Sequence, residues 1–223
     1  MIKTTYIDHM GSDLSVVNAA RVSFGKKSEY ETLTKCYDTG EVINKKLASR
    51  DVKLIKYLAK HKHISPFGHC FASFHVKAPV FVARQLVKHK FLRWNEVSRR
   101  YVDNEPEFYT PDVWRGKADN VKQGSEGAVY PDPELEAFNN HTALRTYKEM
   151  LEAGVAPEMA RMVLPQSTMT EWYWSGSLDA FAAMCQLRCA KDTQYESRVV
   201  ADQINTKMFK LFPVSWDALM GTE

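Results

Sequence analysis

The chain has 223 residues, of which 44% are hydrophobic and 26% are charged, and its formal net charge is +3. These values are ordinary for a soluble globular protein with a sizeable core, and no run of about 18 apolar residues predicts a membrane-spanning helix. The first residues lack the apolar core of a signal peptide, and the four cysteines show neither a CxxC pair nor the spacing of a disulfide framework. We therefore expect a cytoplasmic protein with no metal site and no membrane partner.

The first third of the chain alternates predicted helices with a polar segment. Residues 11–25 carry Ser12 and Asp13 near their start and apolar side chains at helical spacing, which predicts a helix. Residues 26–50 are polar and are predicted to be rich in loops. The next segment, residues 51–63, places Val52 and Ile55 on one apolar stripe, which predicts an amphipathic helix.

A strand followed by a helix is predicted next. Pro66 and Gly68 interrupt the helical pattern, and residues 70–78 (CFASFHVKA) alternate around large apolar side chains as a strand does. Pro79 is suited to the first turn of a helix, which is predicted to continue through residues 80–91.

The remaining segments are predominantly helical. Residues 102–133 contain four prolines and three glycines among polar residues and are predicted to run over the surface. Helices are predicted at residues 134–153, 157–164 and 178–211. Since no clean domain boundary appears, we expect one α+β domain over residues 1–223.

The basic segment at residues 88–101, KHKFLRWNEVSRRY, carries five Lys or Arg residues against one carboxylate. A solvated cationic helix face, a nucleic-acid patch and a phosphate-binding active site would all have this charge. Phe91 and Trp94 alternate with the cations, as the stacking rings of a nucleic-acid patch do, but an extended groove along a nucleic-acid backbone needs more positive charge elsewhere. Charge alone leaves the three alternatives open.

The spacing of polar side chains in this region favours a phosphorylated ligand. Lys88 and His89 follow Gln85 by three and four positions, so these residues share one face of the predicted helix. If the chain is extended beyond it, alternate side chains point the same way. Three of them would then lie on one side: Glu96, Ser98 and Arg100. Arg and Ser bind phosphate oxygens, and Glu accepts hydrogen bonds from hydroxyl or N–H groups.

The order of residues in this segment resembles the signature of the flavin-dependent thymidylate synthases, R-H-R-x-x-S-x-N-E-x-S-x-R-Y. Six positions match in register: His89, Asn95, Glu96, Ser98, Arg100 and Tyr101. The chain departs from the signature at Lys88 and Lys90, where the family has Arg, and at Arg93, where it has Ser. Lysine keeps the charge but loses the planar bidentate fork of arginine.

Other stretches are similar to the same family in order and spacing, so the resemblance covers roughly residues 10 to 200. These stretches are AARVSF (19–24), HKHISPFGH (61–69), FHVKAPVFVARQ (74–85), ARMVLP (160–165) and QLRCAKDTQYE (186–196). The long loop at residues 110–133 does not contribute to the resemblance. Further departures from the family are expected at Gly68, Ser177, Ala183 and Asp192.

The resemblance implies a fold, a reaction and an assembly. The fold is an antiparallel sheet flanked by helices, in homotetramers whose active sites lie between subunits with FAD at the interface. The reaction is reductive methylation of dUMP to dTMP, in which methylenetetrahydrofolate gives the carbon, reduced FAD gives the hydride and NADPH reduces the flavin. The chain shows no GxGxxG motif, which is consistent with a flavin site outside a Rossmann unit.

The resemblance also implies two sets of site residues. The dUMP-binding set is Gln85, Glu96, Ser98, Arg99, Arg100, Arg161 and Arg188. The FAD-binding set is Ser23, His63, Ser65, Lys88, His89, Lys90, Asn95 and Glu96. Arg188 corresponds to the arginine that assists ionisation of the pyrimidine N3, because a permanent cation stabilises the anion that forms there. On the residues alone, Arg188 is equally compatible with a helix-face ion pair to Asp192 or Glu196, and Arg161 with a surface ion pair.

Two other functions stay open from the sequence. One is pyrimidine nucleotide hydroxymethylation on the same fold, in which water rather than hydride completes the reaction. The other is a non-enzymatic nucleic-acid-binding protein that uses Phe91, Trp94 and the surrounding cations.

Overall fold

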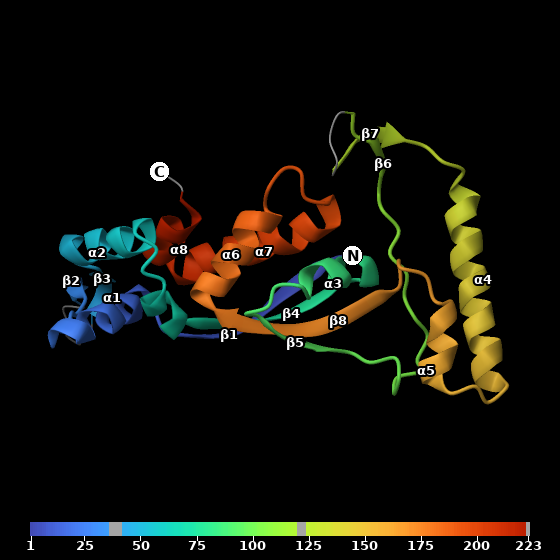
Figure 1. Ribbon diagram of the computed structural model, residues 1–223, viewed down its shortest axis with the longest axis horizontal. Helices are drawn as coiled ribbons and strands as arrows, with labels where there is room; N and C mark the ends of the chain where they lie inside the picture. The colour runs from blue at the N-terminus through green and yellow to red at the C-terminus, as the bar shows by residue number, and fades with distance from the viewer. Residues whose placement is uncertain (36–41, 120–123, 222–223) are drawn as a thin grey trace.

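The computed structural model describes residues 1–35, 42–119 and 124–221. Its centre is a four-stranded antiparallel sheet in the order β1-β4-β8-β5, with β1 at Lys3–Met10, β4 at Phe71–Pro79, β8 at Met169–Ser177 and β5 at Arg93–Glu96 (Figure 1). The α+β class with an antiparallel sheet, expected from the sequence, is confirmed.

Three helices cover one face of this sheet. They are α3 (Val80–Leu86), α6 (Leu178–Arg188) and α7 (Tyr195–Leu211) (Figure 1). The strands turn alternate side chains toward them, as the period of two requires. Phe74 of β4 and Trp174 of β8 are fully buried and meet the ring of Phe181 with centroids 5.3 and 5.8 Å apart. Burial of such aromatic side chains stabilises the layer by about 2 to 3 kcal/mol each.

A helical layer closes one end of the sheet. It contains α1 (Asp13–Arg21), α2 (Ser49–Lys60), α8 (Pro213–Met220) and the short 3-10 helices η1 (Val22–Phe24) and η2 (Ser65–His69). The helices predicted at residues 11–25 and 51–63 are thus confirmed. The prediction of a loop-rich segment at residues 26–50 is wrong in part, because β2 (Glu31–Lys35) pairs with β3 (Val42–Lys46) as an antiparallel hairpin. Residues 36–41 of that segment lie outside the described residues.

The opposite end carries a second hairpin and two helices. Strands β6 (Trp114–Lys117) and β7 (Ser125–Val129) pair within the segment predicted as a surface excursion, and they lead to α4 (Pro133–Glu152) and α5 (Pro157–Ala160) (Figure 1). The side chain of Asp132 caps α4 by accepting a hydrogen bond from the backbone N–H of Glu134 at 2.9 Å. A 3-10 turn, η3 (Arg161–Val163), follows α5.

The helix after Pro79 is shorter than predicted, and this correction matters for the site. Helix α3 ends at Leu86, and the chain then turns through backbone hydrogen bonds from His89 to Leu86 at 3.1 Å and from Leu92 to His89 at 3.2 Å. The turn delivers Leu92 into the core beside Gly176, where a Cβ would collide with the Leu92 Cδ2 atom. Lys88 and His89 therefore lie beyond the helix, not on its face.

One other prediction needs correction. The helix predicted over residues 178–211 is two helices, α6 and α7, because the chain between Arg188 and Tyr195 leaves the helical path. Strand β8 and helix α8 were not predicted. Among the described helices, none is long and apolar enough to cross a membrane.

Candidate active site

The first group of predicted site residues surrounds Arg188 at the end of α6. Its Nε atom donates to Nε2 of His89 at 3.1 Å, and its Nη2 atom approaches the backbone oxygen of Gln85 at 3.5 Å. Gln85, Lys88 and Arg188 line one cavity of about 750 Å³. The alternative of a helix-face ion pair is wrong, since Glu196 pairs with Arg115 and no ion pair joins Arg188 to Asp192 in the described part of the chain.

His89 is held neutral in this group. Burial, and then the nearby charge of Arg188, lower the pKa of His89 from 6.5 to about 4. Because Arg188 donates to Nε2, the neutral ring carries its proton on Nδ1. An acceptor in this place fixes the guanidinium without neutralising its charge, so Arg188 keeps a full positive charge beside the cavity.

Gln85 is fixed by the first turn of α7. Ser197 Oγ donates to Gln85 Oε1 at 3.0 Å, and Gln85 Nε2 donates to Oε1 of Gln194. Both ends of the Gln85 amide are therefore occupied by protein groups, which sets the orientation of the amide. Neither Gln194 nor Ser197 was predicted as a site residue.

The second group of predicted site residues lies around the end of β5. Glu96 accepts hydrogen bonds from Trp94 Nε1 at 3.0 Å and from Thr170 Oγ1 at 2.8 Å. The extended register proposed for this stretch ends at Glu96, because the chain turns where Tyr101 N–H donates to Ser98 O at 3.0 Å. The prediction that alternate side chains of an extended segment point one way is therefore wrong for Arg100, which lies in this turn.

Two predicted cations, Arg100 in this turn and Arg161 in η3, both contact Glu158. Arg100 Nε lies 3.5 Å from Glu158 Oε2, and Arg161 Nε donates to the Glu158 backbone oxygen at 3.2 Å. Arg99 Nη1 instead donates to the backbone oxygen of Asn104 at 2.7 Å. Since Arg100 and Arg161 are exposed, both guanidinium groups are accessible to a ligand.

The two groups of predicted site residues are separate within one chain. Asn95, Glu96 and Arg99 line a cavity of about 520 Å³ that shares no residue with the cavity around Arg188. Over the described residues, no hydrogen bond or ion pair joins the Arg188 group to the Arg100 group. Within one chain, the residues predicted to bind dUMP thus form two separate groups.

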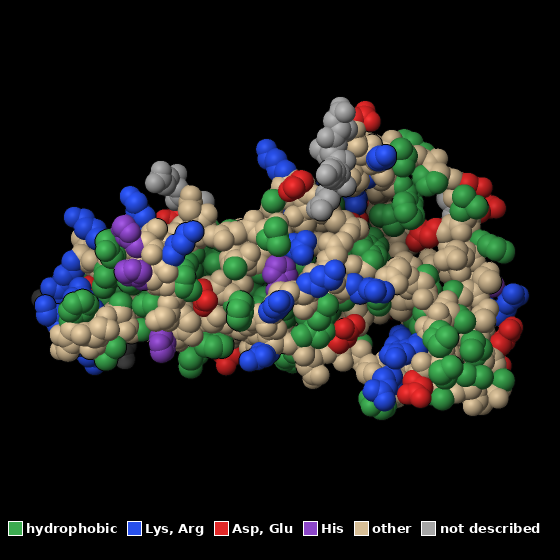
Figure 2. Space-filling model, in the orientation of Figure 1, with side chains coloured by type: hydrophobic (Ala, Val, Ile, Leu, Met, Phe, Trp, Pro, Cys, Tyr) green, Lys and Arg blue, Asp and Glu red, His purple; other side chains and the backbone are tan. Residues whose placement is uncertain are grey.

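The residues predicted to bind FAD are spread over several places, and three of them lie at one end of the sheet. Ser23, His63 and Ser65 are exposed around η1 and η2, just before β4 begins. Strand register places the start of β5 at that same end, since Arg93 lies opposite Ser175 while Phe71 lies opposite Ser177. Lys88 and Lys90 precede β5 and are exposed. Figure 2 shows Lys, Arg and His side chains gathered over α1 and α2 at this end of the molecule.

These hydroxyl, imidazole and ammonium groups suit a cofactor with phosphates. Hydroxyls and cations are the ordinary partners of a diphosphate, and Ser23, His63, Ser65, Lys88 and Lys90 include no carboxylate that would repel it. Where the chain departs from the family, Ser177 begins α6 as its N-cap residue and Ala183 is exposed on that helix.

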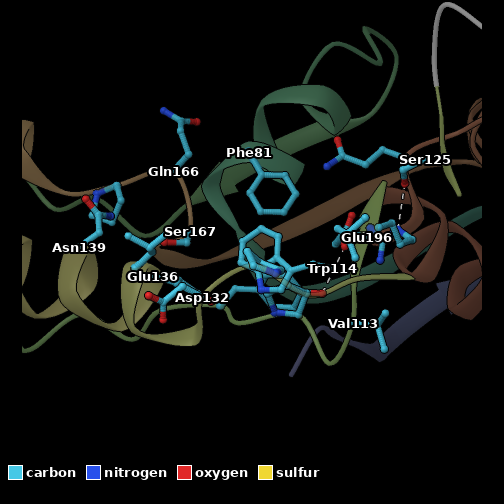
Figure 3. A pocket seen from close by; sticks show the side chains of 18 residues that line it. Phe81, Val113, Trp114, Ser125, Asp132, Glu136, Asn139, Gln166, Ser167 and Glu196 are labelled. Atoms are coloured by element: carbon cyan, nitrogen blue, oxygen red, sulfur yellow. Dashed lines mark hydrogen bonds and ion pairs between the residues drawn. The ribbon is translucent and has the colours of Figure 1, made fainter. Parts of the chain in front are cut away.

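A larger cavity of about 970 Å³ lies between the β6–β7 hairpin, α4 and α7 (Figure 3). Phe81, Tyr109 and Trp114 supply aromatic walls, and Arg115 forms a 2.5 Å ion pair with the buried carboxylate of Glu196 at its edge. No sequence motif marked Arg115, which is the one arginine in residues 110–133, the segment without a family motif. In the part of the chain that the structure covers, no cluster of His, Cys, Asp and Glu is arranged to hold a metal ion.

Two groups of cations thus flank one antiparallel sheet, and in one of them His89 accepts a hydrogen bond from the Arg188 guanidinium. Residues 5–214 match the family described as "Thymidylate synthase complementing protein". The chain belongs to this family.

Relatives of known name agree with the family match. The chain is similar to the flavin-dependent thymidylate synthase of Thermus thermophilus, at 39% identity over 214 residues that cover 95% of this chain and 73% of the relative. It is 36% identical to the enzyme of that name from Thermosipho africanus, over 96% of this chain and 89% of the relative.

A solved structure agrees as well. The UMP/dUMP methylase PolB from Streptomyces cacaoi, bound with 5-Br dUMP, is 31% identical and superposes with a TM-score of 0.79, over 99% of this chain and 95% of PolB.

Proposed function

We propose that this chain is a flavin-dependent thymidylate synthase that methylates dUMP to dTMP. The observation that carries the proposal is the cluster of Arg188, His89 and Gln85 beside one cavity, on a chain whose residues 5–214 belong to the thymidylate synthase complementing family. Each group in the cluster has a role that follows from its contacts.

Arg188 is the proposed catalytic residue. A permanent guanidinium beside the pyrimidine N3 stabilises the anion that forms when the N3 proton leaves, and that anion makes the ring a better nucleophile. The hydrogen bond to neutral His89 orients the guanidinium for this task. A protonated His89 could not accept that hydrogen bond and would repel Arg188, so the low pKa of His89 serves the mechanism.

The second group is proposed to bind the nucleotide phosphate. Arg100 and Arg161 converge on Glu158, and Ser98 lies in the same turn as Arg100. A phosphate carries more charge than the carboxylate and accepts bidentate hydrogen bonds, so it competes with Glu158 for Arg100. Glu96 is proposed to accept hydrogen bonds from ligand hydroxyl or N–H groups. Arg99 belongs to the same proposed set.

The separation of the two groups supports an active site between subunits. A nucleotide places its base and its phosphate on one small molecule, yet among the described residues the cavity that contains Arg188 includes neither Arg100 nor Arg161. Symmetric assembly brings different patches of two copies together. We therefore propose the homotetramer, with Arg188 from one subunit and Arg100 from its partner serving each site.

FAD is the proposed flavin, with NADPH and methylenetetrahydrofolate as co-substrates. When bound, FAD supplies the hydride and the folate supplies the carbon. The residues proposed to hold FAD are Ser23, His63, Ser65, Lys88, His89, Lys90, Asn95 and Glu96. Their exposed hydroxyls and cations fit its diphosphate, and the lysines bind phosphate as point charges rather than as bidentate forks.

The comparisons do not favour the alternative of hydroxymethylation, because the structural relative is named a methylase. The test is the mass of the product formed from dUMP, methylenetetrahydrofolate and NADPH by flavin-loaded protein. We expect dTMP. A hydroxymethyl product would contradict methylation, and a folded protein that retains no flavin band and forms no product would contradict the whole proposal.

A further inference from the structure

We infer that Arg115 is a positioning residue for the proposed nucleotide site, acting through Glu196 and the first turn of α7 on Gln85 and Arg188. The inference rests on the proposed function, which it deepens. Arg115 lies on β6, in the segment that carries none of the family motifs, so this chain uses that segment to set the geometry of the site.

The ion pair of Arg115 with Glu196 is the start of the argument. Arg115 Nη2 lies 2.5 Å from Glu196 Oε1, and the Glu196 side chain is only 3% exposed. Breaking a buried pair by removing one partner leaves an uncompensated charge, which is strongly destabilising. Glu196 Oε2 is itself buried without a hydrogen-bond partner, so Arg115 is the main compensation for this carboxylate. The pair therefore holds α7 and β6 in one arrangement.

Other contacts hold the Arg115 side chain itself. Its Nε atom donates to Ser125 Oγ at 2.9 Å, and its guanidinium lies 4.7 Å from the ring centroid of Tyr195. In Figure 3, Ser125 and Glu196 lie at the same end of the cavity, away from Asn139 of α4. The donors of Arg115 are thus directed to protein groups on both β7 and α7, which fits positioning rather than ligand binding.

The start of α7 connects the Arg115–Glu196 ion pair to Gln85 and Arg188. Gln194 and Ser197, on either side of Glu196 in the sequence, hold the two ends of the Gln85 amide. The backbone oxygen of Gln85 in turn accepts from Arg188 Nη2 at 3.5 Å. A shift of the Glu196 turn would therefore move Gln85 first and Arg188 next.

Arg115 also stands between two cavities. With Ser125 and Gln194, it lines both the cavity of about 750 Å³ that contains Arg188 and the cavity of about 970 Å³ beside α4. Loss of the Arg115 side chain would remove part of the wall that the two cavities share. A loosened wall weakens binding of the nucleotide more than it slows chemistry, because Arg188 keeps its bond to His89.

The test compares four variants of the full chain, each loaded with flavin. Arg115→Met removes the guanidinium, and Arg115→Lys keeps only the charge. The double variant Arg115→Met with Glu196→Gln removes both charges, so that no lone carboxylate is buried. Arg145→Met is the matched control, because Arg145 makes an exposed ion pair with Glu149 on α4 at 3.8 Å.

Steady-state dTMP formation and calorimetric dUMP binding are measured together with thermal unfolding. For Arg115→Met and for the double variant we expect a KM and a Kd for dUMP raised about tenfold, which is about 1.4 kcal/mol, with a smaller loss of kcat. Arg115→Lys is expected to restore part of the affinity, and Arg145→Met to match wild type. Reduction of the flavin by NADPH without dUMP is expected to be unchanged in all four.

The failures can be told apart. A wild-type protein that binds dUMP with flavin but forms no dTMP contradicts the proposed reaction, and the binding comparison still tests Arg115. Variants that only unfold at lower temperature, with wild-type KM and Kd in the folded fraction, overturn the positioning role. If Arg115→Met does not fold, the double variant decides, since wild-type affinity there also overturns the inference.

Discussion

The two halves of the proposed nucleotide site are built differently. The half around Arg188 is partly buried and interlocked, with His89, Gln85 and α7 each fixed by another group. The half around Arg100 is exposed, and its cations rest on Glu158 and on backbone oxygens. The first arrangement fixes geometry before a ligand arrives, whereas the second provides charge that can exchange one anion for another. Activation of the base is therefore expected to depend on Arg188 in the first half, and binding of the phosphate on the second half.

The largest expected effect is on turnover, from the interlocked half. Arg188→Ala should lower kcat by roughly 100-fold or more, because removal of one preorganised electrostatic group typically costs that much. The fold should remain, as Arg188 is near the surface at the end of α6. Turnover and circular dichroism measured together check this, and wild-type turnover in the folded variant would remove Arg188 from catalysis.

The exposed half should instead control affinity. Arg100→Ala is expected to raise the KM for dUMP roughly 10-fold to 100-fold, since a charge-assisted hydrogen bond contributes about 1.5 to 3 kcal/mol. Arg145→Ala serves as the control with a comparable exposed ion pair. An unchanged KM in Arg100→Ala would mean that the phosphate binds elsewhere.

The state of His89 links the interlocked half to pH. The pKa of His89 in the folded protein, about 4, lies below the ordinary value of 6.5, so the unfolded chain binds more protons between these values. Its contribution to stability is therefore fully present above pH 6.5 and is lost as the pH falls through 6.5 toward 4.

His89→Gln should remove that component while keeping an acceptor for Arg188. The measurement is urea unfolding of wild type and variant from pH 4.5 to 7.5, in which the difference between the two isolates His89 from other titrating groups. The charged groups around His89 are Arg188 in direct contact and Lys88 and Lys90 on either side of it in the sequence. A difference that does not change with pH would contradict a neutral, acceptor His89.

The smallest effect is expected from the support of Glu96. Thr170→Val removes the hydroxyl that donates to Glu96 Oε1 at 2.8 Å, while the similar shape of Val preserves the packing of β8. We expect an affinity loss for dUMP of about 1 kcal/mol, or roughly fivefold, measured by calorimetry. A loss as large as that of Arg100→Ala would mean that Glu96, not the cations, dominates binding.

What sequence could predict differs between the same two regions. Local patterns identified α1, α2 and β4, because apolar spacing reports the face that a short element buries. The motif at residues 88–101 contains predicted site residues that lie in both groups, among them His89 and Arg100. It did not reveal that α3 ends at Leu86, since that turn exists to seat Leu92 against Gly176 of a distant strand. Tertiary contacts, not local spacing, set the places of Lys88 and His89.

The residues that support Gln85 could not be predicted from the sequence for a similar reason. Gln194 and Ser197 contact Gln85 from about 110 residues away along the chain. Arg115 reaches Glu196 from about 80 residues away, and it lies in the β6–β7 hairpin, which carries no family motif. A lone Arg in a polar segment is indistinguishable from a solvated cation until the fold places a buried carboxylate beside it. The strand β8, which carries Thr170, was missed because its buried aromatic run gives no clear polar alternation.

The most direct test of the central claim is complementation between subunits. Arg188→Ala and Arg100→Ala chains, each nearly inactive alone at low dUMP, are mixed under conditions that exchange subunits, and dTMP formation is measured with mass analysis of the mixed assemblies. If each site takes Arg188 from one subunit and Arg100 from its partner, random mixing restores both residues in about a quarter of the sites, and we predict activity near that fraction of wild type. Mixed assemblies that form without any recovery of dTMP formation would contradict the shared nucleotide site.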